Sequence, residues 1–68
     1  MFMLKYKAVI KDLYLSKTRV RNVSAYDSLE AHKLALTSVN LAKEDIIKIL
    51  DQDGNIVYNL KQGFLNKY

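Results

Sequence analysis

The feature that most restricts the fold of this chain is the lack of any cross-link in so short a sequence. Its 68 residues include no Cys and a single His, so neither a disulfide framework nor a structural zinc site of the usual kind is expected. A chain of this length forms one domain and buries only about 60% of the surface of its unfolded chain. Half of its residues are apolar, which is typical of a folded domain. The core must therefore suffice alone or be completed by a partner.

The N-terminal residues predict two strands. Apolar and mostly basic residues alternate from Leu4 to Lys11, as in a strand with one buried face. A second strand begins near Lys17. Its later residues, Val23 and Ala25, have the same alternation parity as its basic ones, so we expect either a bulge near Asn22 or strand ends that face different environments.

The next segment predicts one helix. Asp27 and Glu30 form a capping pattern at its start, and we expect the helix to run to about Val39, with Asn40 as a left-handed stop. Small residues at helical spacing indicate close packing on a sheet.

The remaining residues predict two more strands and a tail. The β-branched run Ile46–Leu50 and the segment Ile56–Leu60 flank a polar turn at 51–55, which favours a hairpin. We therefore expect an α+β domain over residues 1–61, with a sheet of four antiparallel strands and the helix across one face. The first strand is expected between the second and the third, and residues 62–68 are expected to form a C-terminal tail.

Charge is concentrated in the first third of the chain. Residues 1–26 contain six basic residues and one acidic residue, a net charge of +5, whereas residues 27–68 contain five Lys and six acidic residues, a net charge of −1. Such asymmetry favours a polyanionic or acidic partner. We expect the helix-free face to be basic and to carry the partner-binding residues, which are Lys5, Lys7, Lys11, Lys17, Arg19 and Arg21. Lys48 is expected on the same face.

Three interpretations of that basic face remain open. It could dock on an acidic protein surface or pair edge to edge with a partner strand. It could instead bind nucleic acid through phosphate contacts, with Tyr14 or another Tyr stacking on a base. The third interpretation is a solvated face whose lysines maintain solubility. Tyr6 has the parity of the core residues, so the aromatic residues do not alternate with the basic ones on one face as in common RNA-binding motifs.

Several residues carry more apolar surface than one helix packed on one sheet is expected to bury. Either a homodimer or packing of the tail within the monomer would bury them. The residues concerned are Leu29, Leu36, Phe64, Leu65 and Tyr68.

Catalysis, metal binding and export are not expected. His32 is the single His and no Cys is present, so the chain lacks the usual nucleophile and base pairs, and we expect no catalytic residue and no cofactor. Asp51–Asn55 resembles the start of a calcium loop but lacks Gly at the sixth position and Glu at the twelfth. Lys5 and Lys7 interrupt the apolar start too early for a signal peptide, and no apolar run reaches the ~20 residues of a membrane helix. These features predict a cytoplasmic protein that does not bind membranes.

One stretch carries a resemblance to a known family. Val23–Ala31, which leads from the second strand into the helix, resembles the corresponding region of small bacteriophage proteins that inhibit the host RNA polymerase. The resemblance implies a non-enzymatic, phage-encoded protein that docks on an acidic or cleft-lining surface of the polymerase, with Lys17, Arg19 and Arg21 as contacts.

The resemblance covers about residues 4–50. Archaeal ribosomal proteins with a basic hairpin before an Ala-rich helix are similar in the same region, which implies the nucleic-acid-binding alternative. The chain departs from both groups in its hairpin around Gly54, its fourth strand and its aromatic tail.

Overall fold

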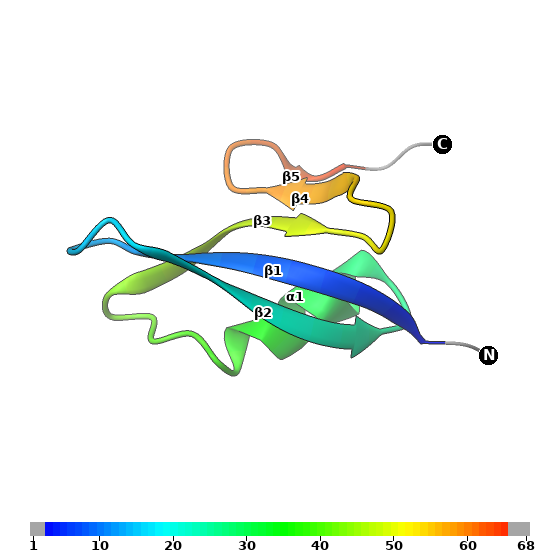
Figure 1. Cartoon of the computed structure of the whole chain (residues 1–68), viewed down its shortest axis with the longest axis horizontal. Coiled ribbons are helices and arrows are strands. Elements are labelled where there is room, and N and C mark those ends of the chain that lie inside the picture. The colour runs from blue at the N-terminus through cyan, green and yellow to red at the C-terminus, as the bar shows by residue number, and fades with distance from the viewer. Residues whose placement is uncertain (1–2, 66–68) are drawn as a thin grey trace.

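The computed structural model describes residues 3–65 and has an α+β fold, with an open antiparallel sheet and one helix against one face. Figure 1 shows the helix behind the sheet and β2 and β5 at its two edges. The spatial strand order is β2-β1-β3-β4-β5, which confirms that the first strand lies between the second and the third. The elements are β1 (Leu4–Asp12), β2 (Thr18–Ala25), α1 (Ser28–Leu36), β3 (Glu44–Leu50), β4 (Ile56–Asn59) and β5 (Gly63–Phe64).

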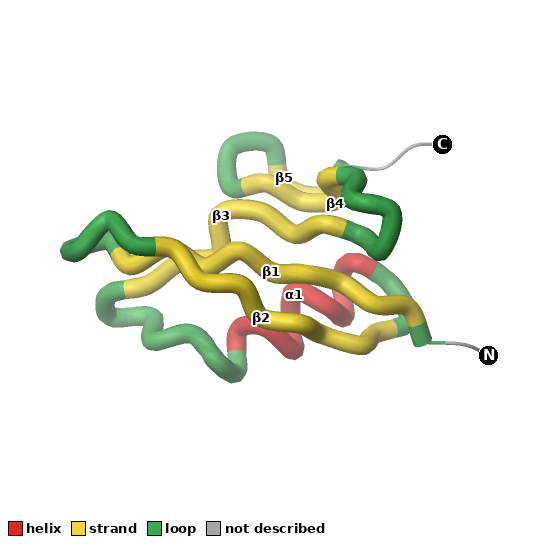
Figure 2. The backbone as a smooth tube through the Cα atoms, in the orientation of Figure 1, coloured by secondary structure: helices red, strands yellow, loops and turns green. Residues whose placement is uncertain are grey.

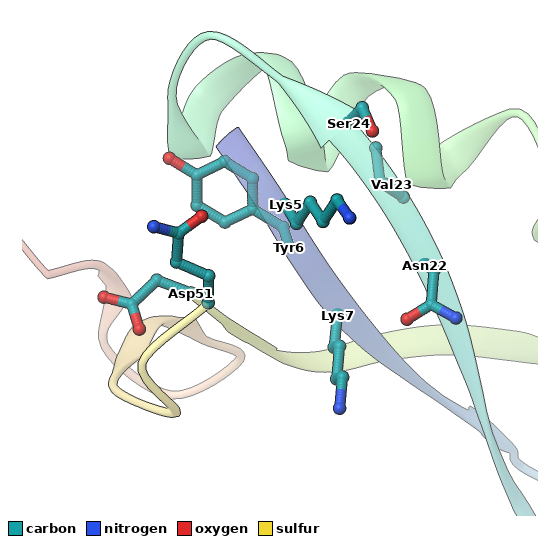
Figure 3. Close-up of a pocket in the computed structure, with 8 residues that line it drawn as sticks. Lys5, Tyr6, Lys7, Asn22, Val23, Ser24 and Asp51 are labelled. Carbon is teal, nitrogen blue, oxygen red and sulfur yellow. The ribbon is translucent and has the colours of Figure 1, made fainter. Parts of the chain in front are cut away.

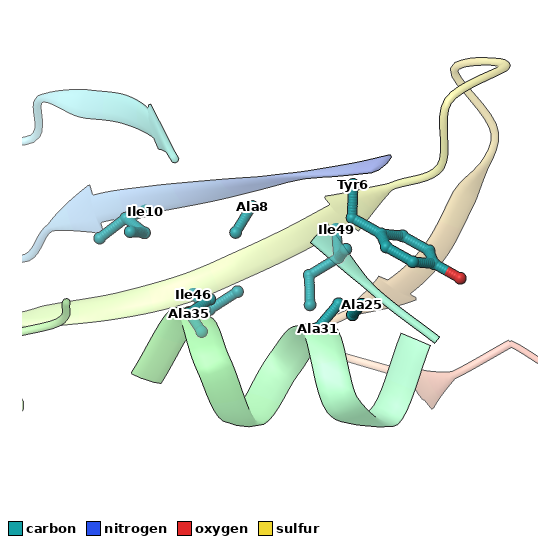
Figure 4. Packing of buried hydrophobic residues seen from close by; sticks show 8 residues of the cluster. All are labelled: Tyr6, Ala8, Ile10, Ala25, Ala31, Ala35, Ile46 and Ile49. Atoms are coloured by element: carbon teal, nitrogen blue, oxygen red, sulfur yellow. The ribbon is translucent and has the colours of Figure 1, made fainter. Parts of the chain in front are cut away.

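The core lies between α1 and the middle of the sheet. Alternate residues of β1 point toward the helix, and Tyr6, Ala8 and Ile10 are buried there. The helix contributes Ala31 and Ala35, both fully buried, and these short side chains let α1 lie close to the strands (Figure 4). The prediction of close packing through small helix residues is thus confirmed.

An irregularity in β3 lets it supply two core residues that ordinary alternation would place on opposite faces. Ile46 and Ile49 are three positions apart, yet both are fully buried. The β1–β3 register shifts between Val9 and Ile10, and this bulge restores the orientation of the second isoleucine. Both isoleucines therefore face α1.

The helix begins as predicted and ends earlier. The Asp27 carboxylate accepts the Glu30 amide at 2.8 Å, while the Glu30 carboxylate accepts the amide of Tyr26 at 2.8 Å. The helix stops at Leu36, with Thr37 as its C-cap. The predicted end at Val39 was wrong, because the final amides bond to carbonyls three residues back and tighten the chain into turns.

The predicted left-handed stop at Asn40 was also wrong. Among the described non-glycine residues, Ser16 alone has a positive φ, of 57°. Asn40 instead organises the segment before β3: its carbonyl accepts the amides of Lys43 and Glu44, and its side chain accepts the Ala42 amide at 3.1 Å. A side-chain-stabilised turn therefore replaces the expected cap.

The two alternatives for β2 are decided by its register. The β1–β2 ladder runs from Leu4 opposite Ala25 to Lys11 opposite Thr18 without a shift, so β2 has no bulge near Asn22. Ala25 is fully buried, whereas Arg21 is exposed. The two ends of β2 face different environments on the same side of the sheet.

The sheet has a fifth strand where the sequence predicted only a tail. Gly63 pairs with Asn59 and Phe64 pairs with Tyr58. The chain reverses through a turn in which the Asn59 side chain accepts the Gln62 amide at 2.7 Å, and Gly63 has a φ of +77°, a conformation that favours glycine. Figure 2 shows this return of the chain alongside β4.

Candidate binding surface

The face of the sheet opposite α1, called here the open face, carries lysines from two strands. Lys5, Lys7 and Lys11 alternate with the core residues of β1, and Lys48 of β3 lies opposite Val9. Lys5 and Lys7 are exposed, whereas Lys11 and Lys48 are partly buried. The predicted placement of these four lysines on the helix-free face is confirmed.

The predicted placement of the arginines on that face was wrong. Arg19 lies opposite Ile10, and Arg21 lies opposite Ala8. Directly opposed residues in a ladder point to the same side of a sheet, so both arginines point to the helix side. The orientation of β2 is set by its buried end at Ala25, and the arginines share that parity. Lys17 is exposed in the turn before β2.

Arg19 has a structural partner. Its Nε and Nη2 atoms donate to the two carboxylate oxygens of Glu44, each at 3.2 Å, and Nη2 also donates to the Ser38 carbonyl at 2.7 Å. The hydrogen bonds from Arg19 and from the Asn40 amide lower the pKa of Glu44 despite partial desolvation. The pKa of Arg19 is raised chiefly by the same hydrogen bond. This pair ties β2 to the segment between α1 and β3.

The open face is polar and aliphatic between its lysines. The residues of β2 on this side are Thr18, Val20, Asn22 and Ser24, opposite the lysines and Val9 of β1. Val20 is 56% exposed. In the described strands the aromatic rings lie on the other side, since Tyr6 is in the core and Tyr58 lies opposite Ile49. The strands of the open face therefore supply no ring on which a base could stack; Tyr14, the predicted stacking residue, is 76% exposed in the turn between β1 and β2.

A hollow of about 400 Å³ lies at the end of the sheet near the turn after β3, and its lining includes open-face residues of β1 and β2 together with Tyr6 and Val23. Figure 3 shows Lys5 and Lys7 of β1 beside Asn22 and Ser24 of β2, with Asp51 at the turn after β3. Burial raises the pKa of Tyr6, which also lines the hollow, and the negative charges of Asp27 and Asp51 raise it further. Asn22, Ser24 and Asp51 were not identified from sequence as site residues, because only the strand register brings them to the lysines.

The apolar residues predicted to need cover have different surroundings. Leu36 packs against the core, and the Leu65 amide donates to the Val57 carbonyl at 2.9 Å. Leu29 is 50% exposed. Tyr68 lies outside the described residues.

Phe64 belongs to an aromatic cluster that joins β5 to the helix. Its ring centroid lies 5.5 Å from that of His32 and 4.9 Å from that of Tyr58, and the His32 and Tyr58 centroids are 4.7 Å apart. Phe64 thus has ring contacts within the monomer, as the tail-packing alternative expects. His32 is partly buried in this cluster.

The turn at 51–55 is a hairpin connection. The Asp51 carboxylate accepts the amides of Asp53 and Asn55, both at 2.9 Å, and Gly54 has a φ of +85°. This geometry, with β3 paired to β4, confirms the hairpin interpretation. Across residues 3–65, no group of three or more His, Cys, Asp or Glu residues is arranged to hold a metal ion.

Within the described residues, α1 is not long and apolar enough to cross a membrane. Comparison with protein-family models, with curated proteins and with solved structures found no match.

Proposed function

We propose that this chain is a small non-enzymatic binding protein that docks its open face on an acidic surface of a partner protein. The observation that carries the proposal is a cationic surface in which lysines outnumber the acidic residues beside them, Asp45 opposite Lys11 and Asp51 in the hollow next to Lys5 and Lys7. Lys5, Lys7, Lys11 and Lys48 share the open face, and none of them forms an ion pair within the described part of the chain.

The composition of the open face favours protein over nucleic acid. Single-stranded nucleic acids are bound by cationic grooves in which aromatic rings stack on the bases, whereas the described strands of the open face have cations without rings and Tyr14 lies outside them, in the β1–β2 turn. Its exposed Val20, together with hydrogen-bonding groups from Asn22 and Ser24, is suited to a protein surface with acidic and polar groups. Nucleic-acid binding and a homodimer are therefore outcomes that the experiment must distinguish.

The resemblance to phage inhibitors of RNA polymerase extends the proposal to the role of the interaction. Bound to a host protein such as a nucleic-acid enzyme, the domain would act by covering a surface or blocking a conformational step. In this role the contacts are the lysines of the open face, with Lys17 beside them in the turn before β2, whereas Arg21 lies on the helix side of β2. Arg19 contributes less, because Glu44 and the Ser38 carbonyl already engage its guanidinium.

A pull-down with a charge-matched control tests the proposal. The wild-type chain and a Lys5/Lys7→Glu variant are each presented to bacterial lysate, with and without nuclease treatment, and, separately, to purified bacterial RNA polymerase. The control is Lys33/Lys61→Glu, which changes two exposed lysines of α1 and of the β4–β5 turn and gives the same net charge.

The proposal predicts that a protein is captured by the wild type and by the control and is lost with Lys5/Lys7→Glu. Equal capture by the two variants would contradict it. Capture that disappears after nuclease treatment, together with direct DNA or RNA binding that weakens steeply with salt, would replace it with the nucleic-acid alternative. A mass of twice the monomer in light scattering, unaffected by these substitutions, would support the homodimer.

A further inference from the structure

The outer edge of β2 is an unpaired strand edge, and the hydrogen bonding identifies which residues form it. The Asp12 amide donates to the Lys17 carbonyl at 2.7 Å, so these two residues are a hydrogen-bonded pair of the β1–β2 ladder. In an antiparallel ladder such pairs alternate with pairs whose backbone groups point away from each other. The register therefore directs the amides and carbonyls of four residues outward: Thr18, Val20, Asn22 and Ser24.

The β1–β3 side gives the same assignment independently. The Leu13 amide donates to the Lys43 carbonyl at 2.8 Å, in register with Lys11 opposite Asp45. The backbone of Lys11 is thus directed toward β3, and its β2 neighbour Thr18 must direct its own groups outward. The strand order ends at β2, and no strand of the described chain covers this edge (Figure 1).

This edge is long and exposed. β2 has eight residues, of which Thr18 to Asn22 and Ser24 are exposed. The opposite edge of the sheet, β5, has two residues. Unpaired amides and carbonyls in a regular strand are a template for an additional strand, and many proteins bind extended peptides in this way.

Arg21 gives the edge a charge preference. It is exposed, points to the helix side and makes no ion pair with any described residue. A strand added to β2 would place a residue directly opposite Arg21 in a non-hydrogen-bonded pair, with Cα atoms about 4.5 Å apart. An acidic side chain there would be stabilised by the guanidinium.

The same charge disfavours a second copy of β2 as the added strand. Two antiparallel copies that use the outward groups can be centred on Val20, Arg21 or Asn22. The first register places Arg19 opposite Arg21, and the second places Arg21 opposite Arg21. Like charges directly opposite each other destabilise a sheet, which disfavours these two registers. The third places Arg21 opposite Val23 and gives the arginine no acidic neighbour, so the edge is better matched to an acidic segment.

We propose that the β2 edge binds an extended acidic segment of the partner as an additional strand, with a carboxylate of that segment paired to Arg21. This inference rests on the proposed function and specifies how the partner would dock. The added strand would extend the sheet beyond β2. Lys7 and Lys11 of β1 would then lie on the other side of β2 from the added strand. Backbone hydrogen bonds would supply affinity, and the arginine would select acidic sequences.

The experiment uses an end-capped eight-residue peptide in which Glu and Thr alternate, with a Lys–Thr peptide as its control. Amide hydrogen exchange of the full chain is followed by NMR with and without peptide. With the peptide at ten times its Kd, exchange of the Thr18, Val20 and Asn22 amides should slow by about tenfold. The Arg19 and Arg21 amides, already bonded to β1, should change much less. The Lys–Thr peptide should leave every rate unchanged.

Two pairs of variants test the contacts. Val20→Pro removes one outward amide, at an edge position where proline is tolerated, and should weaken peptide binding by at least about tenfold, whereas Val20→Ala should not. Arg21→Glu should weaken it comparably, with Lys33→Glu as the charge-matched control. The exchange pattern of the wild type gives an answer even if a variant fails to fold.

The outcomes separate this inference from the proposed function. Uniform protection along β2, or unchanged peptide affinity with both Val20→Pro and Arg21→Glu, would overturn strand addition while leaving docking through the lysines intact. The same conclusion follows if the peptide does not bind but a folded partner is still captured through Lys5 and Lys7. Failure of the peptide and of every lysine-dependent capture would contradict both. Alternating protection without peptide, at rising protein concentration, would overturn the inference in favour of a second copy.

Discussion

The two faces of the sheet differ although the same strand supplies both. On the helix side, β1 contributes Tyr6, Ala8 and Ile10, all buried under α1 and its neighbours. On the open side, the alternate positions of β1 include Lys5 and Lys7, both exposed. The helix side thus forms the core that stabilises the domain, whereas the open side contributes little to that core. The comparison teaches that stability and the proposed binding are carried by adjacent residues, so they can be perturbed separately.

The largest expected effect comes from opening the packed face. Ile10→Ala removes a fully buried side chain and should lower the free energy of unfolding by about 2–5 kcal/mol. The neighbouring Val9→Ala, on the open side and only partly buried, should cost much less. Urea denaturation of both variants measures the contrast. Equal losses of unfolding free energy in the two variants would contradict the distinction between the faces. If Ile10→Ala does not fold, Ile10→Val replaces it in the comparison, with an expected loss of about 0.5–1.5 kcal/mol.

The helix that defines the packed face depends on its N-cap. Asp27→Ala removes the carboxylate that accepts the Glu30 amide and should destabilise the domain by about 1 kcal/mol. Asp53→Ala, in an exposed turn, is the control with the same change of charge. Thermal unfolding followed by circular dichroism compares them, and equal shifts in Tm would show that the cap has no special role.

The β1–β2 turn offers a stabilising change. Ser16 has a φ of 57°, a left-handed conformation that is strained for residues with a Cβ. Ser16→Gly should therefore raise the free energy of unfolding by about 0.5–1 kcal/mol, whereas Ser24→Gly, in the β2 strand, should lower it by a similar amount. Urea denaturation gives both values. Destabilisation by Ser16→Gly would indicate that the turn does not require this conformation.

The smallest expected effect is the pH dependence of the Arg19–Glu44 pair. The hydrogen bond from Arg19 lowers the pKa of Glu44 in the folded chain. A lowered carboxyl pKa contributes stability above the unfolded value of about 4.3, and this contribution is lost as the pH falls through the folded pKa. The stability difference between wild type and Glu44→Gln should therefore be present at neutral pH and fade in acid. A difference that is independent of pH would contradict this role of the ion pair.

The sequence predicted the fold better than it predicted the site. The alternation in β1, the cap at Asp27 and the turn at Gly54 are local signals, so the strands, the helix start and the hairpin could be read directly. β5 could not, because two residues show no periodicity and its position depends on a turn and on the rings around Phe64.

The orientation of the arginines could not be read for a related reason. Arg19 and Arg21 alternate in phase with Val23 and Ala25, so all four point to the same side of β2. No local sequence signal indicates whether the basic half or the apolar half of the strand determines which side that is. The contact of Arg19 with Glu44 joins residues 25 positions apart. Consequently the sequence assigned all the basic residues of the N-terminal hairpin to one surface, whereas the fold separates the lysines of the open face from the arginines of the helix side.

The most direct test of the central claim is lysine acetylation of the chain, free and bound to its captured partner, followed by mass spectrometry. Lys5 and Lys7 should lose reactivity in the complex, whereas Lys33 and Lys61, exposed on α1 and in the β4–β5 turn, should keep it. Protection of Lys33 and Lys61 with full reactivity of Lys5 and Lys7 would contradict the proposal that the open face binds the partner.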